Sequence, residues 1–548
     1  MQNEEVTNNI YESNNVNIPD SIDYNTGGSN YELPDLHENF ETEILSDISV
    51  LNAAIDIELE ENYYTSDSIS EDYQDDSDET IRNELKQWAL KFNISQISLS
   101  ALLKMLKSHS CFGTLPLDAR TIMGTAKLTD TMTVDPGKYV HFGIQKGVVK
   151  KLSTFNYTGN QVTLDINIDG LPISKSGRSQ VWPIQARIRE ITESPPFFIG
   201  IWHGPGKPKS FNEFMQLFVE DAKILLGRGI LFKNKSVKLD IRAYICDAPA
   251  RAEISYIKGH NAYYGCGKCT QKGKYDNGRV VFSTHMFDLR TDLDTRTGKH
   301  FTGETILKKL PVGLVSEIPY EYQHLVCQGV MKKLLLSWCT TSKKSYSISH
   351  RDKIKMTERL LLMSKYVPSE FQRNTRSIQD IKYWKATEFR MFLLCVGPLV
   401  LKHIIKDEFY KHFMLLHCAI KILVSKDLYI LQHETAQHLL ERFVSGFSKL
   451  YGSYSVSYNV HGLLHISYDS VTLGPLDQFS TFPFENNLQQ VKKLIRTTAK
   501  PLEQLANRIN EGFTSIGKPL VNTKTIPAKC IPAVQFEQLL LANNIKNW

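Results

Sequence analysis

Three carboxylates lie where a metal-dependent site for phosphodiester chemistry would need them. Asp169 ends the alternating apolar run VTLDINID, and Asp247 ends a second such run, VKLDIRAYICD. Chain-turning residues follow both, so we expect both side chains at strand ends. Glu485 opens the amphipathic stretch ENNLQQVKKLI, which indicates a helix. Two strand-end aspartates and one helical glutamate can share a pair of Mg²⁺ or Mn²⁺ ions about 3.5 to 4 Å apart and align a water or a 3′-hydroxyl for in-line attack on phosphorus.

Each acid also has an ordinary structural interpretation. Asp247 precedes an Ala-Pro pair and could cap the following helix. Glu485 could be a first-turn glutamate favoured by the helix dipole. Asp165 competes with Asp169 because residues four apart on a strand point to the same face, but Asp169 lies at the strand's end, where a metal can reach it. The combination of three acids, in this order and on these element types, favours the metal site.

A second group of side chains fits zinc. Cys266 and Cys269 form a CxxC pair, and the spacing of His461 and His465 would put two imidazoles on one helical face, which completes a tetrahedral Cys₂His₂ set. His260 is a rival ligand. The structural alternative is two reduced thiols in a turn beside two histidines on a buried helix. No thioredoxin-like βαβ unit precedes the CxxC pair, so a redox role is disfavoured.

Two further sets of residues could support the acids. The basic residues Lys492, Lys493 and Arg496 follow the third acid along the same expected helix. They could hold the nucleic-acid strand that is attacked, and a solvated helix face explains them equally well. Glu321 and His324 lie near the start of another expected helix, where capping is the simpler interpretation than contact with the site.

The elements that must position these residues alternate between strand and helix patterns. The run YVHFGIQKGVVKKLS is typical of a first strand, and from Val162 three strands, a helix and another strand follow. Acids end the first and last of these five elements, which is the element order of an RNase H-like core. Residues 323–452 are dominated by helical patterns, so a helical insertion accounts for the 238 residues between Asp247 and Glu485, against 78 between the two aspartates.

Charge divides the chain unevenly. Residues 1–80 hold 22 acidic residues and no lysine or arginine, while the remainder holds all 64 Lys and Arg against 37 acidic residues, which gives formal charges of −22 and +27. The composition of the tail predicts disorder. A basic body is expected of a partner for phosphate backbones, and the acidic tail either aids solubility or competes with DNA for the basic face.

Residues 81–109 indicate two short helices, with Asn93 or Ser95 capping the second. Such a helical pair is more often a packing module than a reader of DNA.

These patterns predict an α/β protein with an RNase H-like mixed sheet core, interrupted by a large all-α insertion and preceded by a disordered acidic tail. The expected parts are an acidic tail (1–80), a small helix-turn-helix-like module (81–128), the first part of the core with the CxxC pair (129–275), the helical insertion (276–455), the return to the core with the catalytic helix (456–515) and a C-terminal tail (516–548).

Six separated blocks, over about residues 80 to 515, resemble the transposases of CACTA (En/Spm-like) DNA transposons. In chain order they are INIDGLPISKSGRSQVWPI, ICDAPARAEISYIKGHNAYYGCGKC, YEYQHLVCQGVMKKLLLSW, WKATEFRMFLLCVGPLVLK, YNVHGLLHI and GPLDQFSTFPFENNLQQVKKLIRTTAKPLEQLANRI. The resemblance implies an RNase H-like DDE transposase in which Asp169, Asp247 and Glu485 match the family's three acids. The family's CxxC pair and paired histidines fall on the four zinc-type residues named above.

The chain also departs from the family's pattern. Where the family often has Asp-Tyr-x-His, this chain has Glu321 three residues before His324, which conserves the charge. The C-terminus is short for the family, as expected of a truncated or inactive copy.

The leading interpretation is a transposase, active or decayed, that binds double-stranded transposon-end DNA. It would use Mg²⁺ or Mn²⁺ at the three acids to hydrolyse a strand and join the 3′-hydroxyl to target DNA, with a structural Zn²⁺ at the Cys/His set. A homodimer is compatible with the sequence, and the acidic tail could contact its own basic body. The alternative is a domesticated DNA-binding regulator that no longer cuts DNA. A plain RNase H-like nuclease is disfavoured because it needs no helical insertion.

Cysteine usage and hydropathy bear on the compartment. Nine scattered cysteines without an N-terminal signal pattern indicate a reducing environment. The most apolar stretch, MFLLCVGPLVLKHII, is too short to span a bilayer, so we expect a soluble intracellular protein without a membrane partner. No compact Lys/Arg run marks nuclear import, and the expected nuclear localisation rests on function alone.

Overall fold

The computed structural model describes residues 74–512 except 174–177, 286, 294–297, 368–370, 372 and 498. The expected C-terminal tail, and all but the last few residues of the expected acidic tail, lie outside the described residues. One boundary is corrected: helix α2 (Gln74–Lys91) begins before residue 81, so the helical module starts earlier than expected.

The N-terminal module contains the expected helix pair. Its elements are α2, α3 (Gln96–Lys107), η1 (Ser110–Phe112) and α4 (Ala119–Met123). Ser95, the second of the two expected caps, begins α3, because its Oγ accepts the backbone N–H of Ser98 at 3.0 Å. Asn93 instead takes a positive φ of 52° in the turn between the helices. Leu99 and Leu103 are buried in the small core that holds the helices together.

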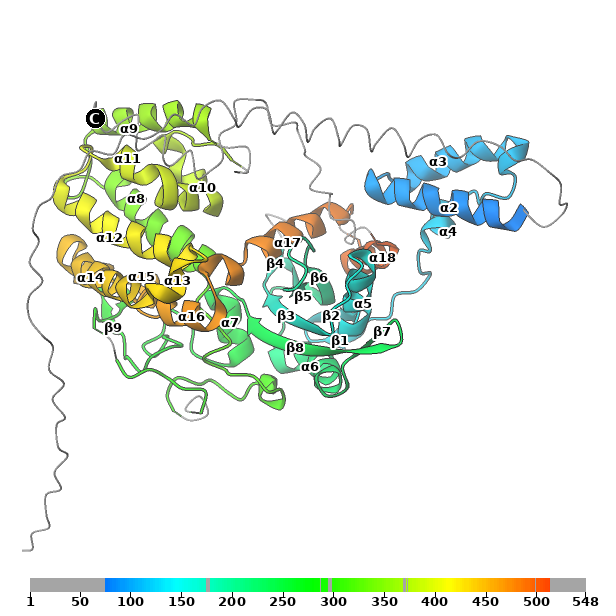
Figure 1. Cartoon of the computed structure of the whole chain (residues 1–548), viewed down its shortest axis with the longest axis horizontal. Helices are drawn as coiled ribbons and strands as arrows, with labels where there is room; N and C mark the ends of the chain where they lie inside the picture. Colours follow the sequence, from blue (N-terminus) through cyan, green and yellow to red (C-terminus); the bar gives the residue numbers. More distant parts are fainter. Residues whose placement is uncertain are drawn as a thin grey trace, which may run out of the picture. The chain divides into compact units, whose positions relative to one another are not determined.

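A mixed sheet of eight strands forms the centre of the α/β part (Figure 1). Its hydrogen-bonded order is β1-β2-β6-β5-β3-β8-β7, with β4 beside β5. The strands are β1 (Met132–Val134), β2 (Gly137–His141), β3 (Gln161–Ile168), β4 (Leu171–Pro172), β5 (Ser179–Ile188), β6 (Phe197–Pro205), β7 (Ile230–Phe232) and β8 (Lys235–Tyr244). Among the described strands, β3 and β8 are the parallel pair, and the other neighbours are antiparallel.

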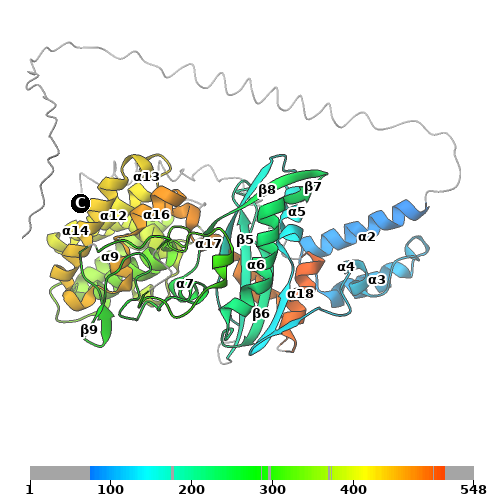
Figure 2. The same ribbon diagram turned by 90° about the horizontal axis from the view of Figure 1, so that it is seen from below.

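Helices cover both faces of the sheet. They are α5 (Ile144–Thr154), α6 (Phe211–Arg228), α17 (Phe482–Leu494) and α18 (Pro501–Glu511). The buried sides of α5 and α6 share one apolar core with the sheet, and α18 with the end of α17 shares a second. In β6, Phe197 belongs to the first core and Phe198 to the second, as the alternation of a strand requires. Figure 2 shows α6 lying along the sheet.

One expected strand is wrong in its second half. The run YVHFGIQKGVVKKLS divides into β2 and helix α5, with Gly143 at a φ of 86° between them. Ile144, Val148 and Leu152 recur every fourth residue and are all buried, which is helical rather than strand spacing. The three strands, the helix and the strand expected after Val162 are confirmed as β3, β5, β6, α6 and β8.

Helices dominate the chain after residue 323, as expected. The remaining elements are α7 (Ala248–Ser255), β9 (Lys274–Asp276), β10 (Arg279–Val281), η3 (Ile306–Lys309), η4 (Gln323–Met331), α8 (Lys332–Thr340), α9 (His350–Met363), η5 (Ser364–Tyr366), η6 (Ile378–Tyr383), α10 (Ala386–Met391), η7 (Phe392–Val396), α11 (Gly397–Leu401), α12 (Asp407–Val424), α13 (Leu428–Leu431), α14 (His433–Tyr451), η8 (Ser453–Ser455), α15 (Tyr458–Gly462), α16 (Ile466–Leu473) and η9 (Leu476–Phe479). Both η4 and η7 are π-helices. The apolar core of these helices includes Ala243 and Ile245 at the end of β8, so the insertion packs directly on the sheet.

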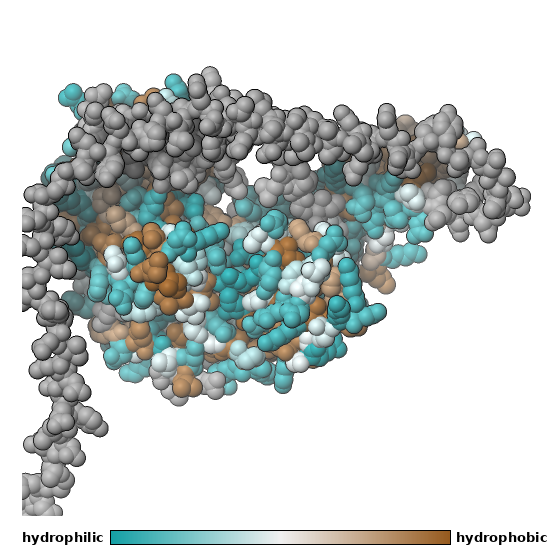
Figure 3. Space-filling view, viewed as in Figure 1, coloured by the Kyte–Doolittle hydropathy of each residue, from teal (hydrophilic) through white to brown (hydrophobic). Residues whose placement is uncertain are grey.

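One face of the described part of the chain is mainly polar (Figure 3). On the face shown in Figure 3, hydrophilic side chains cover most of the described surface, and apolar side chains gather in places over helical elements. Within the described residues, no helix combines the length and the apolar character needed to cross a bilayer.

Candidate functional site

Asp169 and Asp247 follow two neighbouring parallel strands. Ile166 of β3 pairs with Tyr244 of β8, and the Ile245 backbone N–H donates to the Ile166 carbonyl at 2.7 Å. Asp169 and Asp247 each come three residues after this pair, beyond the last residues of β3 and β8. Because neighbouring strands lie about 4.8 Å apart, the two carboxylates share one edge of the sheet.

The electrostatics of Asp169 reflect this proximity. Burial raises the pKa of its carboxyl group to about 7, and the negative charge of Asp247 adds to the shift. The charge of His324 opposes the shift, while Glu485 contributes to it, so all four side chains influence one another. A carboxylate held beside others in this way gains from a cation, which removes the repulsion.

Asp165, the rival of Asp169, is engaged elsewhere. Its side chain has no exposed surface and forms ion pairs with Arg187 at 3.1 Å and Arg242 at 2.7 Å. Both arginines also donate to the backbone carbonyl of Gln478, after α16. Asp165 therefore joins the sheet to the helical part and is not available to a metal.

Asp247 is a helix cap, as its structural interpretation expects. Its Oδ1 accepts the Ala250 backbone N–H at 2.8 Å and so caps α7, and its charge acts on Asp169. Capping uses one oxygen atom and fixes the direction of the carboxylate.

Glu485 lies in the first turn of α17, and its side chain is paired with a histidine. Its Oε1 is 3.1 Å from His324 Nε2, and His324 Nδ1 is 2.7 Å from Glu321 Oε2. Burial alone would lower the pKa of His324, but the two carboxylates raise it to about 11, so the ring is an imidazolium that bridges them.

Glu321 is both a helix cap and a support for the site. Its carboxylate accepts the backbone N–H groups of Gln323 at 2.6 Å and His324 at 2.7 Å at the start of η4. It also accepts the Thr481 backbone N–H at 2.9 Å, one residue before α17. One buried carboxylate thus fastens the two helix starts that carry His324 and Glu485.

A chain of buried amides ties α17 to the sheet beneath the acids. Asn487 Nδ2 donates to Gln185 Oε1 at 2.8 Å, Gln185 Nε2 donates to Asn167 Oδ1 at 3.0 Å, and Asn167 Nδ2 donates to the Ile245 carbonyl at 2.8 Å. All three side chains are buried. Sequence reasoning missed these residues, although Asn167, a polar residue inside an apolar strand, was a signal.

The three acids do not form a compact single-ion site. Among the described residues, the group of three or more potential ligands whose donor atoms lie within 4.8 Å of one another is the Cys/His cluster.

The Cys/His cluster has the dimensions of a tetrahedral zinc site. Cys266 Sγ and Cys269 Sγ are 3.5 Å apart, the Cys266–His465 and Cys269–His461 contacts are 3.5 and 3.4 Å, and the two Nε2 atoms are 3.4 Å apart. Zinc bond lengths predict edges of about 3.8 Å for S to S, 3.6 Å for S to N and 3.4 Å for N to N. The four residues fit Zn²⁺ at a closed structural site, and the rival ligand His260 lies outside the cluster.

The two histidines differ from expectation in one respect. They do not share a helix: His461 is in α15, which ends at Gly462, and His465 stands at the N-terminus of α16. The break turns both Nε2 atoms toward the cysteines. Burial raises the pKa of the Cys266 thiol, but hydrogen bonds and charge from Cys269 and the imidazoles lower it well below its usual value, toward the thiolate that binds metals.

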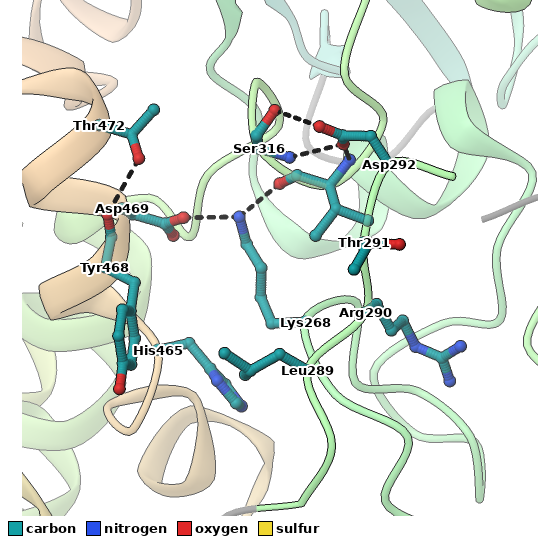
Figure 4. Close-up of a pocket in the computed structure, with 11 residues that line it drawn as sticks. Lys268, Leu289, Arg290, Thr291, Asp292, Ser316, His465, Tyr468, Asp469 and Thr472 are labelled. Carbon is teal, nitrogen blue, oxygen red and sulfur yellow. Dashed lines mark hydrogen bonds and ion pairs between the residues drawn. The ribbon is translucent and has the colours of Figure 1, made fainter. Parts of the chain in front are cut away.

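Charged side chains support the cluster from outside (Figure 4). Lys268, between the two cysteines, donates to Asp469 Oδ1 at 2.6 Å and to the Val315 carbonyl at 2.6 Å. The other oxygen of Asp469 accepts the Tyr320 backbone N–H at 2.8 Å. Arg290 Nε donates to the Cys269 carbonyl at 2.9 Å. The CxxC turn is therefore held to α16 by an ion pair as well as by its ligand residues.

The expected basic residues are exposed, and one is displaced. Lys492 lies about two turns after Glu485 on the same face of α17, and Lys493 follows it. Arg496 lies beyond the helix, because α17 ends at Leu494, which corrects the expectation of a single helix for all three.

Neither a protein-family model nor a curated protein matches this sequence.

Proposed function

We propose that this chain is a DDE-type DNA transposase of the CACTA kind, or a decayed descendant of one, that cuts and joins DNA strands at Asp169, Asp247 and Glu485. The observation that carries the proposal is that the two aspartates follow paired parallel strands at one sheet edge, close enough for the charge of Asp247 to raise the pKa of Asp169, while hydrogen bonds hold the helix of Glu485 beside them.

The topology of the sheet supports an RNase H-like core. Three antiparallel strands, β6-β5-β3, are followed in the sheet by β8, which runs parallel to β3 and is reached through α6. This order supports the proposed RNase H-like core, in which the first acid would follow the first strand, the second the fourth strand, and the third would lie on a later helix.

The three acids have complementary roles in the proposed reaction. Bound Mg²⁺ or Mn²⁺ would polarise the phosphate and activate the attacking oxygen. Asp169 and Asp247 provide a fixed anionic edge, and the cap on α7 fixes the direction of Asp247. Glu485 is oriented by His324, whose other nitrogen is held by Glu321. In the first step water attacks phosphorus and loses a proton, and the 3′-oxygen leaves with the electron pair of the broken P–O bond and takes up a proton. In the second, the freed 3′-hydroxyl loses its proton and attacks a target phosphate, and the 3′-oxygen of the target strand leaves with the electron pair of its P–O bond.

Charge and the second cluster support the same assignment. The chain after residue 80 has a formal charge of +27, which favours a polyanionic partner such as double-stranded DNA. A zinc ion at the Cys/His cluster would join the CxxC turn to α15 and α16, shortly before the segment that carries Glu485. Nuclear localisation follows from the proposed substrate.

The test is a cleavage assay on linear duplex DNA with and without Mg²⁺. The purified chain should nick or cut the DNA, and Asp169→Asn, Asp247→Asn and Glu485→Gln should each abolish the product. Asp240→Asn is the matched control, since it makes the same change on an exposed side chain of β8. Cleavage that survives Asp247→Asn would overturn the catalytic assignment, and binding without Mg²⁺-dependent cleavage would point instead to a DNA-binding regulator.

A further inference from the structure

A polar cleft opens beside Glu485. Its volume is about 560 Å³, and it lies between η4, the segment around η6 and α10, and the first turns of α17. Basic, amide and aromatic side chains line it, together with Glu485. The helical insertion provides most of the wall, and the third acid of the candidate site lies in it.

The walls of the cleft are cationic. Lys332, Arg373, Lys382 and Lys385 all line it, and none of the four forms an ion pair with another described residue. Arg373, Lys382 and Lys385 are exposed. Glu485 is the acidic residue among the lining side chains, so positive charge surrounds the approach to one carboxylate. This arrangement attracts a polyanion and directs it toward the acids.

Two buried polar atoms in the cleft have no hydrogen-bond partner among the described residues. They are Gln323 Oε1 and Thr387 Oγ1, and the Gln323 side chain is only 1% exposed. Buried polar groups are normally satisfied, so an unpaired amide oxygen and hydroxyl in a cleft are suited to a ligand that brings donors and acceptors. Gln323 begins η4, which ends next to Lys332, and Thr387 lies in α10, which Lys385 precedes.

An aromatic side chain completes the lining. Tyr383 is 73% exposed, although aromatic rings of this size are usually covered. Exposed rings beside a positive groove form stacking platforms for bases, which accept any base because each has a π-face. The size of the cleft matches a ligand of about one or two nucleotides rather than a double helix.

We propose that this cleft binds a short single-stranded stretch of DNA, unpaired next to the phosphate that reacts, with its backbone on the lysines and a base on Tyr383. The inference rests on the proposed function, because it identifies how the substrate reaches Glu485. The other polyanion at hand is the chain's own acidic segment, residues 1–80, and the experiment distinguishes the two.

The experiment measures binding of a fluorescein-labelled oligo-deoxythymidine by anisotropy, with the full chain in a buffer that lacks Mg²⁺, Mn²⁺ and any chelator, so that no cleavage occurs and the Cys/His cluster keeps its metal. Lys382→Ala combined with Lys385→Ala should weaken binding and flatten the slope of log Kd against log salt by about 1.4, since each lost contact to a single strand contributes about 0.7. The matched control is Lys411→Ala combined with Lys426→Ala, which removes the same charge from exposed positions outside the cleft.

A second pair of variants tests the stacking. Tyr383→Ala should weaken binding by at least about fivefold, while Tyr383→Phe, which keeps the ring, should bind as the unchanged chain does. All five substituted positions are exposed, and thermal melting checks that the variants fold. Stacking is absent if Tyr383→Ala binds normally.

The outcomes separate this inference from the proposed function. Unchanged or tighter binding by the double lysine variant would overturn the inference and identify another occupant, such as the acidic segment, even if the chain cleaves DNA. Weaker binding with a flatter salt slope supports the inference, even if no cleavage is found in Mg²⁺.

Discussion

Removing one cysteine of the Cys/His cluster should remove a stoichiometric zinc ion. The unchanged chain is expected to hold one Zn²⁺, because the four ligand atoms already span the edges of a zinc tetrahedron. Cys269→Ser replaces a soft thiolate with a hydroxyl that stays protonated at neutral pH, and the three remaining ligands cannot close the site. The same loss of zinc is expected for His461→Ala, which removes one of the two imidazole ligands.

The expected effect on stability can be estimated. If free zinc stands about a thousandfold above the dissociation constant, binding adds about 4.1 kcal/mol to the free energy of unfolding. A domain of this size loses about 2 to 4 °C of Tm per kcal/mol, so Cys269→Ser or complete chelation should lower Tm by about 8 to 16 °C. Cys266 and Cys269 belong to the core of the helical part, so the loss should destabilise that core.

Two assays read out the site directly. Metal content by mass spectrometry should fall from one zinc per chain to none in Cys269→Ser. Substitution with Co²⁺ should give the intense visible bands of a tetrahedral ion with thiolate ligands, and the variant should lack them. Cys327→Ser is the control, because that thiol is equally buried but outside the cluster. Unchanged zinc content in Cys269→Ser, or no Co²⁺ spectrum for the unchanged chain, would refute the assignment.

Three further substitutions test the supports of the acids. Glu321→Gln should reduce Mg²⁺-dependent cleavage about 10- to 100-fold without changing duplex binding, because it weakens the hold on His324, the imidazolium that orients Glu485. Equal losses of cleavage and of binding would contradict this. Asp165→Asn should lower the free energy of unfolding by about 3 to 5 kcal/mol in urea titration, since it leaves two part-buried arginines without their anion, and a loss under 1 kcal/mol would count against it. Asn487→Ala should cost about 1 to 3 kcal/mol in the same titration because the Gln185 carbonyl oxygen loses its donor, and an unchanged midpoint would show that the amide chain is dispensable.

The residues that sequence reasoning located are those with local signals. Asp169 and Asp247 each end an apolar alternation before turn residues, and Cys266 with Cys269 has a ligand spacing that needs no knowledge of the fold. The pairing of β3 with β8, the strands that the two aspartates follow, has no such local signal. The offset between β3 and β8 depends on which strands pair, and that is decided by the packing of α5 and α6 on the sheet rather than by either strand alone.

The residues that sequence reasoning missed depend on partners far along the chain. Gln185 bonds to Asn487 across 302 positions, and Arg187 bonds to the Gln478 carbonyl across 291. Each member, taken alone, resembles an outward-facing polar residue of a strand or helix. The early end of α17 was likewise not evident, because Ile495 keeps the apolar spacing of the helix but adopts an extended backbone with ψ of 112°.

Hydrogen bonds from the helical insertion hold Glu485, the third acid, in its position. Glu485 is held from the sheet side by Asn487, two residues later on α17, and from the insertion side by His324 and the shared cap of Glu321. Because η4 also carries Gln323 into the cationic cleft, any ligand that shifts η4 must act on the hydrogen bonds that orient Glu485. Glu485 follows Asp247 by 238 residues, but a few hydrogen bonds from η4 and from the sheet hold its helix in place. The helical insertion is therefore part of the candidate site and does not merely interrupt it.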